Sequence, residues 1–222
     1  LEDNGVFVIQ ANYLTDMLDN NTFDNIYHEH LCYYSLKPLT VLFKKFDMEV
    51  FDVEHSSIHG GSIIVCIRKG ITSSPKEAVD QLLAEEKKRG LYSLNTYQDF
   101  AFRTRQVKEQ LVAMLTELKA KGKRIAAYSA PAKGNTMLNY CKVGPNILDY
   151  AAEKNPLKVG LYTPGMHIPV IAEETCRQNP PDYFLVLAWN FLDEFLQKEE
   201  VYLGKGGEFI VPIPLPHIVG AK

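Results

Sequence analysis

The spacing of hydrophobic and polar residues divides the chain into a short N-terminal part and a longer C-terminal part. In the first part, apolar and β-branched runs predict strands over 5–11, 48–53 and 62–68, a helical turn over 13–18, and a helix over 36–46 capped by Ser35. The 5–11 run is almost wholly apolar, which predicts a buried strand. Residues 23–35 show no clear period, so we expect an irregular segment there.

Two helices with clear boundaries follow. Residues Ser74 to Glu77 are typical of a capping box with Pro75 in the first turn, and the helix that they open should end at Gly90. A second, longer amphipathic helix is predicted from about residue 96 to 121, with Gly122 ending it. Its apolar stripe consists of Phe100, Val107, Leu111, Met114, Leu115 and Leu118.

Strands and helices alternate over the remaining residues. We expect strands over 124–128, 147–152, 167–171, 183–189 and 208–213, with helices over 135–140 and 190–200. Such alternation is typical of a mostly parallel sheet, so the fold class is α/β. We predict two domains, 1–70 and 71–222, of which the second is a complete α/β domain and the first is incomplete.

The composition is that of an ordinary globular protein and argues against several kinds of partner. The 222 residues are 46% hydrophobic and carry a formal net charge of -3, with no basic patch, so we expect no nucleic acid partner. No apolar run approaches the roughly 18–20 residues that cross a bilayer, so we expect no membrane partner. Four widely spread cysteines lie in or beside apolar stretches, which favours small buried side chains and a cytoplasmic protein.

The stretch FDNIYHEH, Phe23 to His30, concentrates side chains that carry chemistry. As a metal site, His28 and His30 would share a face only in a strand, which would turn Glu29 away. As an acid/base site, a turn would bring Tyr27 and His30 together, with a carboxylate orienting the imidazole base. From spacing alone, a polar surface loop accounts for the stretch about as well as these two alternatives together.

Two later stretches combine glycine with a histidine. In IHGGS, His59 precedes Gly60 and Gly61, whose backbone N–H groups could approach a ligand closely. In TPGMHIP, Gly165 and two prolines form a rigid loop that presents His167. A structural turn is the simpler interpretation of both.

The stretch AAYSAPAKGNT has the layout of a phosphate-binding turn between a strand and a helix. The helix amides and Lys133 would meet a diphosphate there. The stretch matches neither common glycine-rich motif, and Ser129 stands where a dinucleotide turn usually has glycine. A plain turn packed with alanine is an equally good interpretation.

The stretch LAWN ends a predicted buried strand. In open α/β sheets ligands gather at that edge, so Trp189 could stack on a base or sugar. Since Trp189 is the sole tryptophan of the chain, a place in the core fits it equally well.

Taken in order, these stretches resemble the C-terminal half of the bacterial sugar C-methyltransferases. Those enzymes use S-adenosylmethionine to methylate a nucleotide-linked keto-sugar at carbon. The resemblance extends from about Gly5 to Pro214 through FDNIYHEHLCYYS, FDVEHSSIHGGS, YSAPAKGNTMLNY, TPGMHIPV and PDYFLVLAWNF.

The resemblance implies a fold and a separate function for each of the two domains. Residues 1–70 would be the last strands of a class I methyltransferase domain, and residues 71–222 a Rossmann-like C-terminal domain that binds the nucleotide-sugar. A zinc-binding domain and the glycine-rich loop for S-adenosylmethionine would precede Leu1. The chain itself would then hold no metal and little of the cofactor.

The resemblance also implies roles for individual residues. A base removes the proton next to the keto group, and the resulting enolate takes the methyl group. His30 would be that base, Glu29 would orient it, Tyr27 would lie near the keto oxygen, and His28 would be incidental. The nucleotide-sugar would be held by residues of the later stretches, namely His59, Gly60, Gly61, Ser129, Ala130, Lys133, Gly134, Asn135, His167, Trp189 and Asn190.

Two other functions stay open from the sequence. The chain could be a non-catalytic module that binds a nucleotide-sugar, or a metal hydrolase built on His28, Glu29 and His30. The incomplete first domain would leave a strand edge bare. We therefore expect residues 1–70 either to be poorly ordered or to be covered by a second copy of the chain.

Overall fold

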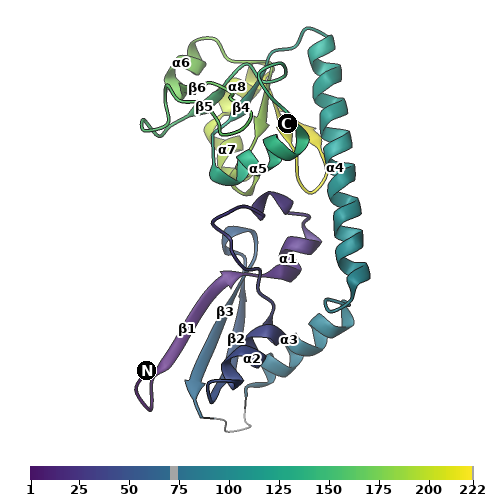
Figure 1. The fold of residues 1–222 in the computed structure, drawn as a ribbon. Helices are drawn as coiled ribbons and strands as arrows, with labels where there is room; N and C mark the ends of the chain where they lie inside the picture. The colour runs from purple at the N-terminus through teal and green to yellow at the C-terminus, as the bar shows by residue number, and fades with distance from the viewer. Residues whose placement is uncertain (71–74, 222) are drawn as a thin grey trace. The chain divides into compact units, whose positions relative to one another are not determined.

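The computed structural model describes residues 1–70 and 75–221, which form two compact units (Figure 1). Unit 1 comprises Leu1–Asn21 and Glu29–Ala101, and unit 2 comprises Thr22–His28 and Phe102–Lys222. The chain thus enters unit 2 briefly at Thr22, returns to unit 1 at Glu29, and passes to unit 2 again within a long helix. The proposed domain boundary after residue 70 stays a prediction.

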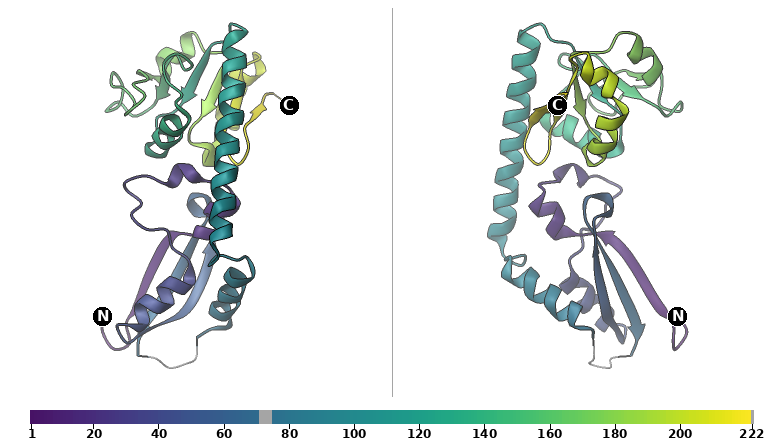
Figure 2. Two further views of the ribbon diagram at one scale, coloured as in Figure 1. Left: turned by 45° about the vertical axis from the view of Figure 1, so that its right-hand side comes forward. Right: turned by 180° about the vertical axis from the view of Figure 1, so that it is seen from behind.

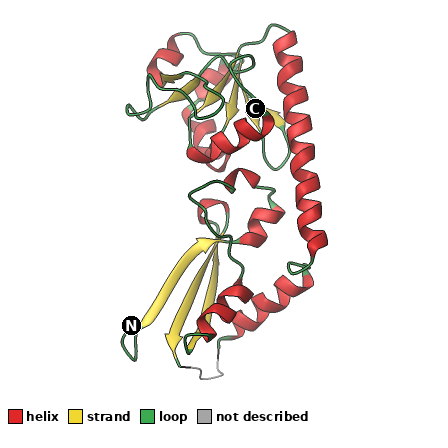
Figure 3. Cartoon of the chain, viewed as in Figure 1, coloured by secondary structure: helices red, strands yellow, loops and turns green. Residues whose placement is uncertain are grey.

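Unit 1 is a three-stranded antiparallel sheet with helices (Figure 3). The strand order is β1-β3-β2. Its elements are β1 (Val6–Asn12), α1 (Leu14–Asp19), α2 (Leu36–Lys44), β2 (Met48–Ser56), the 3₁₀ turn η2 (Ile58–Gly60), β3 (Ser62–Lys69) and α3 (Glu77–Lys88). The predicted strands and helices of this region are all present, with boundaries shifted by a few residues.

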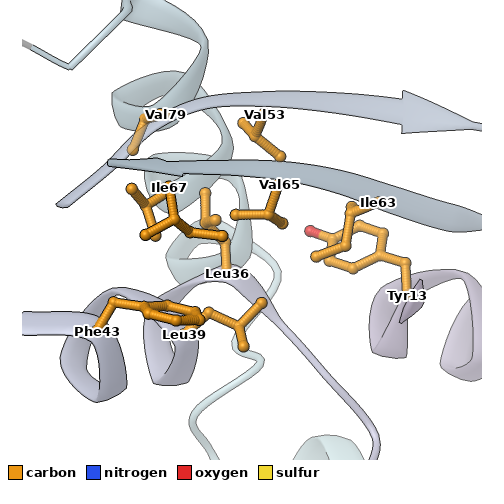
Figure 4. Packing of buried hydrophobic residues seen from close by; sticks show 10 residues of the cluster. Tyr13, Leu36, Leu39, Phe43, Val53, Ile63, Val65, Ile67 and Val79 are labelled. Carbon is orange, nitrogen blue, oxygen red and sulfur yellow. The ribbon is translucent and has the colours of Figure 1, made fainter. Parts of the chain in front are cut away.

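The core of unit 1 lies against β3, the central strand (Figure 4). Because side chains alternate along a strand, Ile63, Val65 and Ile67 share one face, and none of the three is exposed to solvent. Leu36 and Leu39 of α2 pack in the same cluster. Burying each such side chain stabilises the fold by about 1.5–3 kcal/mol, so this face anchors unit 1.

The edge strand β1 corrects one prediction. We expected a buried strand, but Val6, Phe7 and Val8 are 49%, 45% and 54% exposed. Within the described residues β1 pairs only with β3, so its outer side has no neighbouring strand. An apolar run therefore does not by itself guarantee burial.

The helix ends of unit 1 also differ from the predicted capping. Ser35 precedes α2 but makes no side-chain cap hydrogen bond. Instead Glu86 of α3, which is wholly buried, accepts hydrogen bonds from the N–H groups of Leu36 and Lys37. Helix α3 begins at Glu77, two residues after Pro75, and the predicted capping residue Ser74 lies outside the described residues.

Unit 2 contains a six-stranded sheet of order β6-β5-β4-β7-β8-β9. The strands are parallel except β9, which runs antiparallel to β8. The strands are β4 (Ile125–Tyr128), β5 (Ala151–Glu153), β6 (Val170–Ala172), β7 (Tyr183–Val186), β8 (Glu208–Val211) and β9 (His217–Val219). Numbered from β4, this is the order 3-2-1-4-5-6 of a Rossmann fold, which confirms the predicted α/β class.

The helices of unit 2 follow the strands in the manner of this fold. The long helix α4 (Leu94–Ala120), where the chain passes from unit 1, is unbroken (Figure 2) and buries the predicted residues Val107, Leu111 and Leu115. The others are η1 (Phe23–Asn25), α5 (Ala132–Cys141), α6 (Glu173–Gln178), η3 (Trp189–Phe191), α7 (Leu192–Lys198) and α8 (Glu200–Gly204). On one face of the sheet, aromatic residues pack with side chains of α6, α7 and α8.

Several predicted boundaries in unit 2 are wrong. The strand expected from residue 147 begins only at Ala151, because Leu148 is buried in a turn rather than in the sheet. Strand β7 ends at Val186, so Trp189 lies in η3. Helix α6 and strand β9 were not expected at all. Among the described residues, none of the helices combines the length and apolar character that a bilayer crossing requires.

Candidate functional site

The segment from Asn21 to His30 is half buried and half exposed. Thr22, Phe23 and Asp24 are at most 4% exposed, whereas His28 and Glu29 are exposed. The irregular course expected here is confirmed, since only the 3₁₀ turn η1 is regular. The interpretation as a polar surface loop therefore fits the second half of the segment and not the first.

The proposed catalytic triplet is divided between the two units. Tyr27 belongs to unit 2, and Glu29 and His30 belong to unit 1. In unit 2 the Tyr27 ring meets His28 edge to face at 5.9 Å between centroids, and in unit 1 His30 meets Tyr33 in the same way at 6.5 Å. Both Tyr27 and His30 are half-buried, which leaves part of each side chain open to a substrate.

The turn after β4 is held by a carboxylate from the next strand. Ser129 adopts φ of 67°, the left-handed region that favours glycine, which fits its place at a usual glycine position. Glu153, at the end of β5, accepts a hydrogen bond from the Ala130 N–H at 3.0 Å. Lys158 donates to the Ala130 carbonyl at 2.8 Å and lies 3.5 Å from Glu153. The N–H and the carbonyl of Ala130 are thus both hydrogen-bonded, which fixes the turn.

Glu153 is buried and nevertheless charged. Burial alone would raise its pKa, but the N–H groups of Asn155, Ala130 and Lys154 and the Lys158 ammonium together lower the pKa of this carboxyl. In dinucleotide-binding Rossmann folds an acidic residue about 20 positions after the glycine turn binds a ribose hydroxyl. Glu153 stands at that place in this fold.

Lys133 and Trp189, which we expected to hold a ligand, contact a carboxylate of the protein itself. Trp189 Nε1 donates to Asp24 Oδ2 at 2.7 Å, and Lys133 Nζ lies 3.9 Å from the same oxygen. Lys133 Nζ also donates to Asn190 Oδ1 at 2.5 Å and lies 4.2 Å from the Trp189 ring centroid. Three of the proposed ligand-binding residues therefore form one cluster, whose centre is Asp24.

The charges of this cluster are strongly desolvated. Burial raises the pKa of Asp24, against the opposing effect of Lys133 and the Trp189 N–H. Burial lowers the pKa of Lys133, against the opposing effect of Asp24. The Lys133 ammonium thus has an internal counterion and is not a free ligand for a diphosphate.

Gly134 has a packing role in the first turns of α5. A Cβ atom there would lie 2.9 Å from the Leu187 Cβ, so glycine lets the helix approach the segment after β7. Asn135, one residue on, lines a cavity of about 300 Å³ beside α5. Ala130, Lys158 and Tyr162 line the same cavity.

The cavity beside α5 has a largely apolar lining with a few polar groups. Leu161 and Tyr162 on the loop after β5 are 57% and 64% exposed, so an aromatic surface is available for stacking. The Lys158 side chain is 43% exposed. The cavity lies next to the turn held by Glu153, since Ala130 belongs to both.

The space beside the glycine pair after β2 is taken up by the protein's own atoms. The N–H groups of Gly60 and Gly61 donate to the carbonyls of Ser57 and Ile58 at 3.3 and 3.2 Å. A Cβ on Gly61, where φ is 122°, would lie 2.2 Å from Asp16 Oδ2. The turn therefore serves the packing of unit 1, and the side chain of His59 lies outside what the structure describes.

The TPGMHIP loop is a tight hairpin. Its backbone is closed by bonds from the Thr163 N–H to the Ile168 carbonyl and from the His167 N–H to the Thr163 carbonyl, each at 2.9 Å. Gly165 packs against Asn139, which a Cβ would approach to 2.0 Å. His167 is exposed, as the structural interpretation of this loop expects.

The structure also describes the cysteines and the arrangement of potential metal ligands. Cys141 and Cys176 are buried as expected, but Cys32 is exposed, which corrects the prediction for that residue. Cys32 lies in the irregular segment rather than in an element with a core-facing side. In residues 1–70 and 75–221, no group of three His, Cys, Asp or Glu side chains is arranged to hold a metal ion.

Sequence reasoning missed three residues that organise this site: Asp24, Glu153 and Lys158. The position of Glu153, 24 residues after Ser129, could have identified it once the strand order was known. Nothing in the local sequence pairs Asp24 with Trp189, which is 165 residues away along the chain.

Comparison with known proteins finds one matching family model and one similar protein. A family model described as the C-methyltransferase C-terminal domain matches residues 57–214. The C-methyltransferase NovU of Streptomyces niveus is 38% identical over 223 residues, which cover 100% of this chain and 53% of that protein. The chain thus spans about half the length of the curated relative that it matches.

Proposed function

The chain belongs to the C-methyltransferase family, and from this premise we propose that it supplies the base for carbon methylation of a nucleotide-linked keto-sugar. The activity is that of the full-length protein. The observation that carries the nucleotide part is the cavity of about 300 Å³ beside the first βα turn of a Rossmann-ordered sheet. Pockets for nucleotides lie at this edge of such sheets.

In this proposal the nucleoside lies in the cavity beside α5. Its base would stack on Tyr162, with the amide of Asn135 within the same pocket. Glu153 is charged and sits at the place of a ribose-binding acid, and Lys158 adds a cation for a phosphate. The cluster of Lys133, Trp189 and Asn190 is not assigned to the ligand, because its polar groups are engaged with each other and with Asp24.

The chemistry of the chain's own residues is proton transfer. The carbonyl of a keto-sugar acidifies the adjacent C–H, and His30 is the residue type that accepts a proton near neutral pH. Glu29 would orient the imidazole, and the Tyr27 hydroxyl would donate a hydrogen bond to the enolate oxygen as charge develops on it. These roles rest on the resemblance of FDNIYHEHLCYYS to the sugar C-methyltransferases.

The methyl donor of this enzyme class is S-adenosylmethionine, which supplies an electrophilic methyl group. The described residues do not fit a site for it. The one glycine pair of unit 1 that might have cradled it, Gly60–Gly61, is packed against Asp16. We therefore assign only the proton transfer to this chain, and no step of methyl transfer.

The test is a pair of histidine variants in the full-length protein. With a nucleotide-linked keto-sugar as substrate, His30→Ala should lower methyl transfer about 100- to 10,000-fold, the usual contribution of a general base. His28→Ala, two residues earlier in the sequence and exposed, is the matched control and should keep wild-type turnover. Exchange of the substrate's acidic hydrogen with solvent deuterium reports the proton transfer separately.

Two results would change the proposal. Normal turnover by His30→Ala would remove the base assignment. Binding of the nucleotide-sugar without methylation or hydrogen exchange in the full-length wild type would instead favour the non-catalytic binding module.

A further inference from the structure

The crevice at which a Rossmann fold gathers ligands is occupied here by the protein's own segment Thr22–His28. The connection after β4 leads to β5 on one side and the connection after β7 leads to β8 on the other, so the strand order reverses between β4 and β7. Lys133 follows β4 and Trp189 follows β7, and both contact Asp24. The segment therefore sits at the topological switch point of unit 2.

The docking of this segment combines a buried carboxylate with aromatic packing. Asp24 has no solvent exposure and accepts the Trp189 indole N–H at 2.7 Å. Phe23 is 4% exposed and its ring lies 5.3 Å from that of Tyr140 in α5. A buried carboxylate is costly unless it is paired and hydrogen-bonded, so its contacts define one position for the segment.

The backbone between Asp24 and Tyr27 is fixed by short-range bonds. The Asn25 N–H donates to the Thr22 carbonyl at 3.1 Å, and the Ile26 N–H donates to the Phe23 carbonyl at 3.0 Å. The Tyr27 N–H then donates to the Asn25 carbonyl at 3.1 Å. A displacement of Asp24 is therefore transmitted to Tyr27.

We propose that Asp24 is a positioning residue: held by Trp189 and Lys133, it fixes the segment that presents Tyr27 at the switch point of unit 2. This inference rests on the proposed function, in which Tyr27 meets the enolate oxygen. It reassigns Trp189 and Lys133 from direct ligand contacts to supports of the segment that carries Tyr27. Misplacing a reacting group by about 1 Å can cost roughly 100-fold in rate, so the contact matters for turnover.

The test compares four substitutions in the full-length protein. Asp24→Ala removes the acceptor, Asp24→Asn keeps an amide oxygen that can accept the indole N–H, and Trp189→Phe removes the N–H but keeps an aromatic ring. Asp149→Asn is the matched control, because Asp149 forms an exposed pair with Lys119 at 2.7 Å in the same unit. Each variant is assayed for kcat, for KM of the nucleotide-sugar, for hydrogen exchange at the substrate and for thermal unfolding.

The expected result is a loss of kcat with KM little changed. Asp24→Ala and Trp189→Phe should lower kcat and hydrogen exchange about 10- to 100-fold, with KM within about threefold of the wild type. Asp24→Asn should recover part of the loss, because it keeps an acceptor for the indole N–H, and should unfold below the wild-type temperature, because it leaves the Lys133 ammonium without its counterion. The control Asp149→Asn should match the wild type in every measurement.

A second measurement does not depend on activity. Trp189 is the only tryptophan of the 222 residues, and the difference in emission between the wild type and Trp189→Phe isolates its fluorescence in the full-length protein, which reports its contact with Asp24. The emission should change in Asp24→Asn and not in Asp149→Asn. Unchanged emission would overturn the proposal, since the contact on which it rests would be absent.

The kinetic outcomes separate this inference from the proposed function. A wild type that neither methylates nor exchanges the substrate's hydrogen refutes the proposed function. An active wild type with normal kcat in Asp24→Ala and Trp189→Phe refutes only the positioning role. A raised KM with retained kcat in Trp189→Phe also refutes it, because Trp189 would then touch the ligand directly.

Discussion

Replacement of Glu86 should unfold the first turn of α2 and destabilise unit 1. Glu86 is wholly buried and accepts hydrogen bonds from the Leu36 N–H at 2.5 Å and from the Tyr13 hydroxyl at 3.2 Å. It also accepts from the Lys37 N–H at 3.3 Å and from the hydroxyl of Tyr92. One carboxylate thus links Tyr13, which precedes α1, to α2 and α3, and it takes the place of the side-chain cap that Ser35 does not form.

The magnitude follows from which donors lose their acceptor. In Glu86→Leu, the Tyr13 hydroxyl and the Leu36 N–H would be left buried, whereas Lys37 and Tyr92 are exposed enough to bond to water. A hydrogen bond to a charged group contributes roughly 1.5–3 kcal/mol, so two such losses amount to about 4 kcal/mol. Both buried donors bond to Glu86 Oε1, so Glu86→Gln, whose amide oxygen can take that place, should destabilise unit 1 much less.

Urea denaturation followed by circular dichroism measures the loss, and amide hydrogen exchange locates it. The N–H groups of Leu36 and Lys37 should lose protection first in Glu86→Leu. Glu85→Gln is the control, because Glu85 forms an exposed pair with Arg89 at 3.1 Å and such a pair contributes only about 0.3–0.5 kcal/mol. A Glu86→Leu protein with wild-type stability and wild-type exchange at Leu36 would refute the reasoning.

Two further predictions concern titration and reactivity. Burial, and then the hydrogen bond to Glu199, raise the pKa of Tyr128 above its ordinary value. The stability that this gives is fully present below about pH 10, where the unfolded tyrosine is still protonated, and it should decrease as the pH rises and the unfolded tyrosine ionises. Urea midpoints measured from pH 8 to 11 give the slope of stability against pH. Tyr128→Phe should reduce this slope, and an unchanged slope in that variant would contradict the prediction. Burial raises the pKa of the Cys141 thiol to about 11, so iodoacetamide at pH 8 should label exposed Cys32 and leave Cys141 unmodified in the folded chain. Mass spectrometry counts the labels. A Cys32→Ser variant should lose the label that attaches fastest, and rapid labelling of Cys141 would contradict the prediction.

The sequence was most informative where periodicity and burial coincide. The stripe through Val107, Leu111 and Leu115 correctly located α4, and alternating strands and helices correctly indicated the Rossmann-like sheet. Periodicity failed where an apolar residue is buried outside a regular element, as with Leu148, or exposed within one, as with Val8. Burial depends on neighbours that a local pattern does not contain.

The site shows the same limit more sharply. The segment around Tyr27 could be proposed as a site from the sequence, since its polar side chains are adjacent along the chain, and the roles of Tyr27, Glu29 and His30 stay predictions. The partners of Lys133 and Trp189 could not, because Asp24 reaches them only through the fold. A basic residue at the start of a helix, such as Lys133, suggests a bound anion. Here the anion is the carboxylate of Asp24.

The carboxylate of Glu153 has a consequence for the thermodynamics of ligand binding. Because it already holds the Ala130 N–H and the N–H groups of Lys154 and Asn155, the turn after β4 and the loop after β5 are ordered without a ligand. Ordering a residue's backbone costs about 1–2 kcal/mol in conformational entropy, and here that cost falls on folding rather than on binding. In the proposed function, a nucleoside would therefore bind beside this turn with little loop-ordering entropy, and its ribose hydroxyls would meet an acceptor that is already in place.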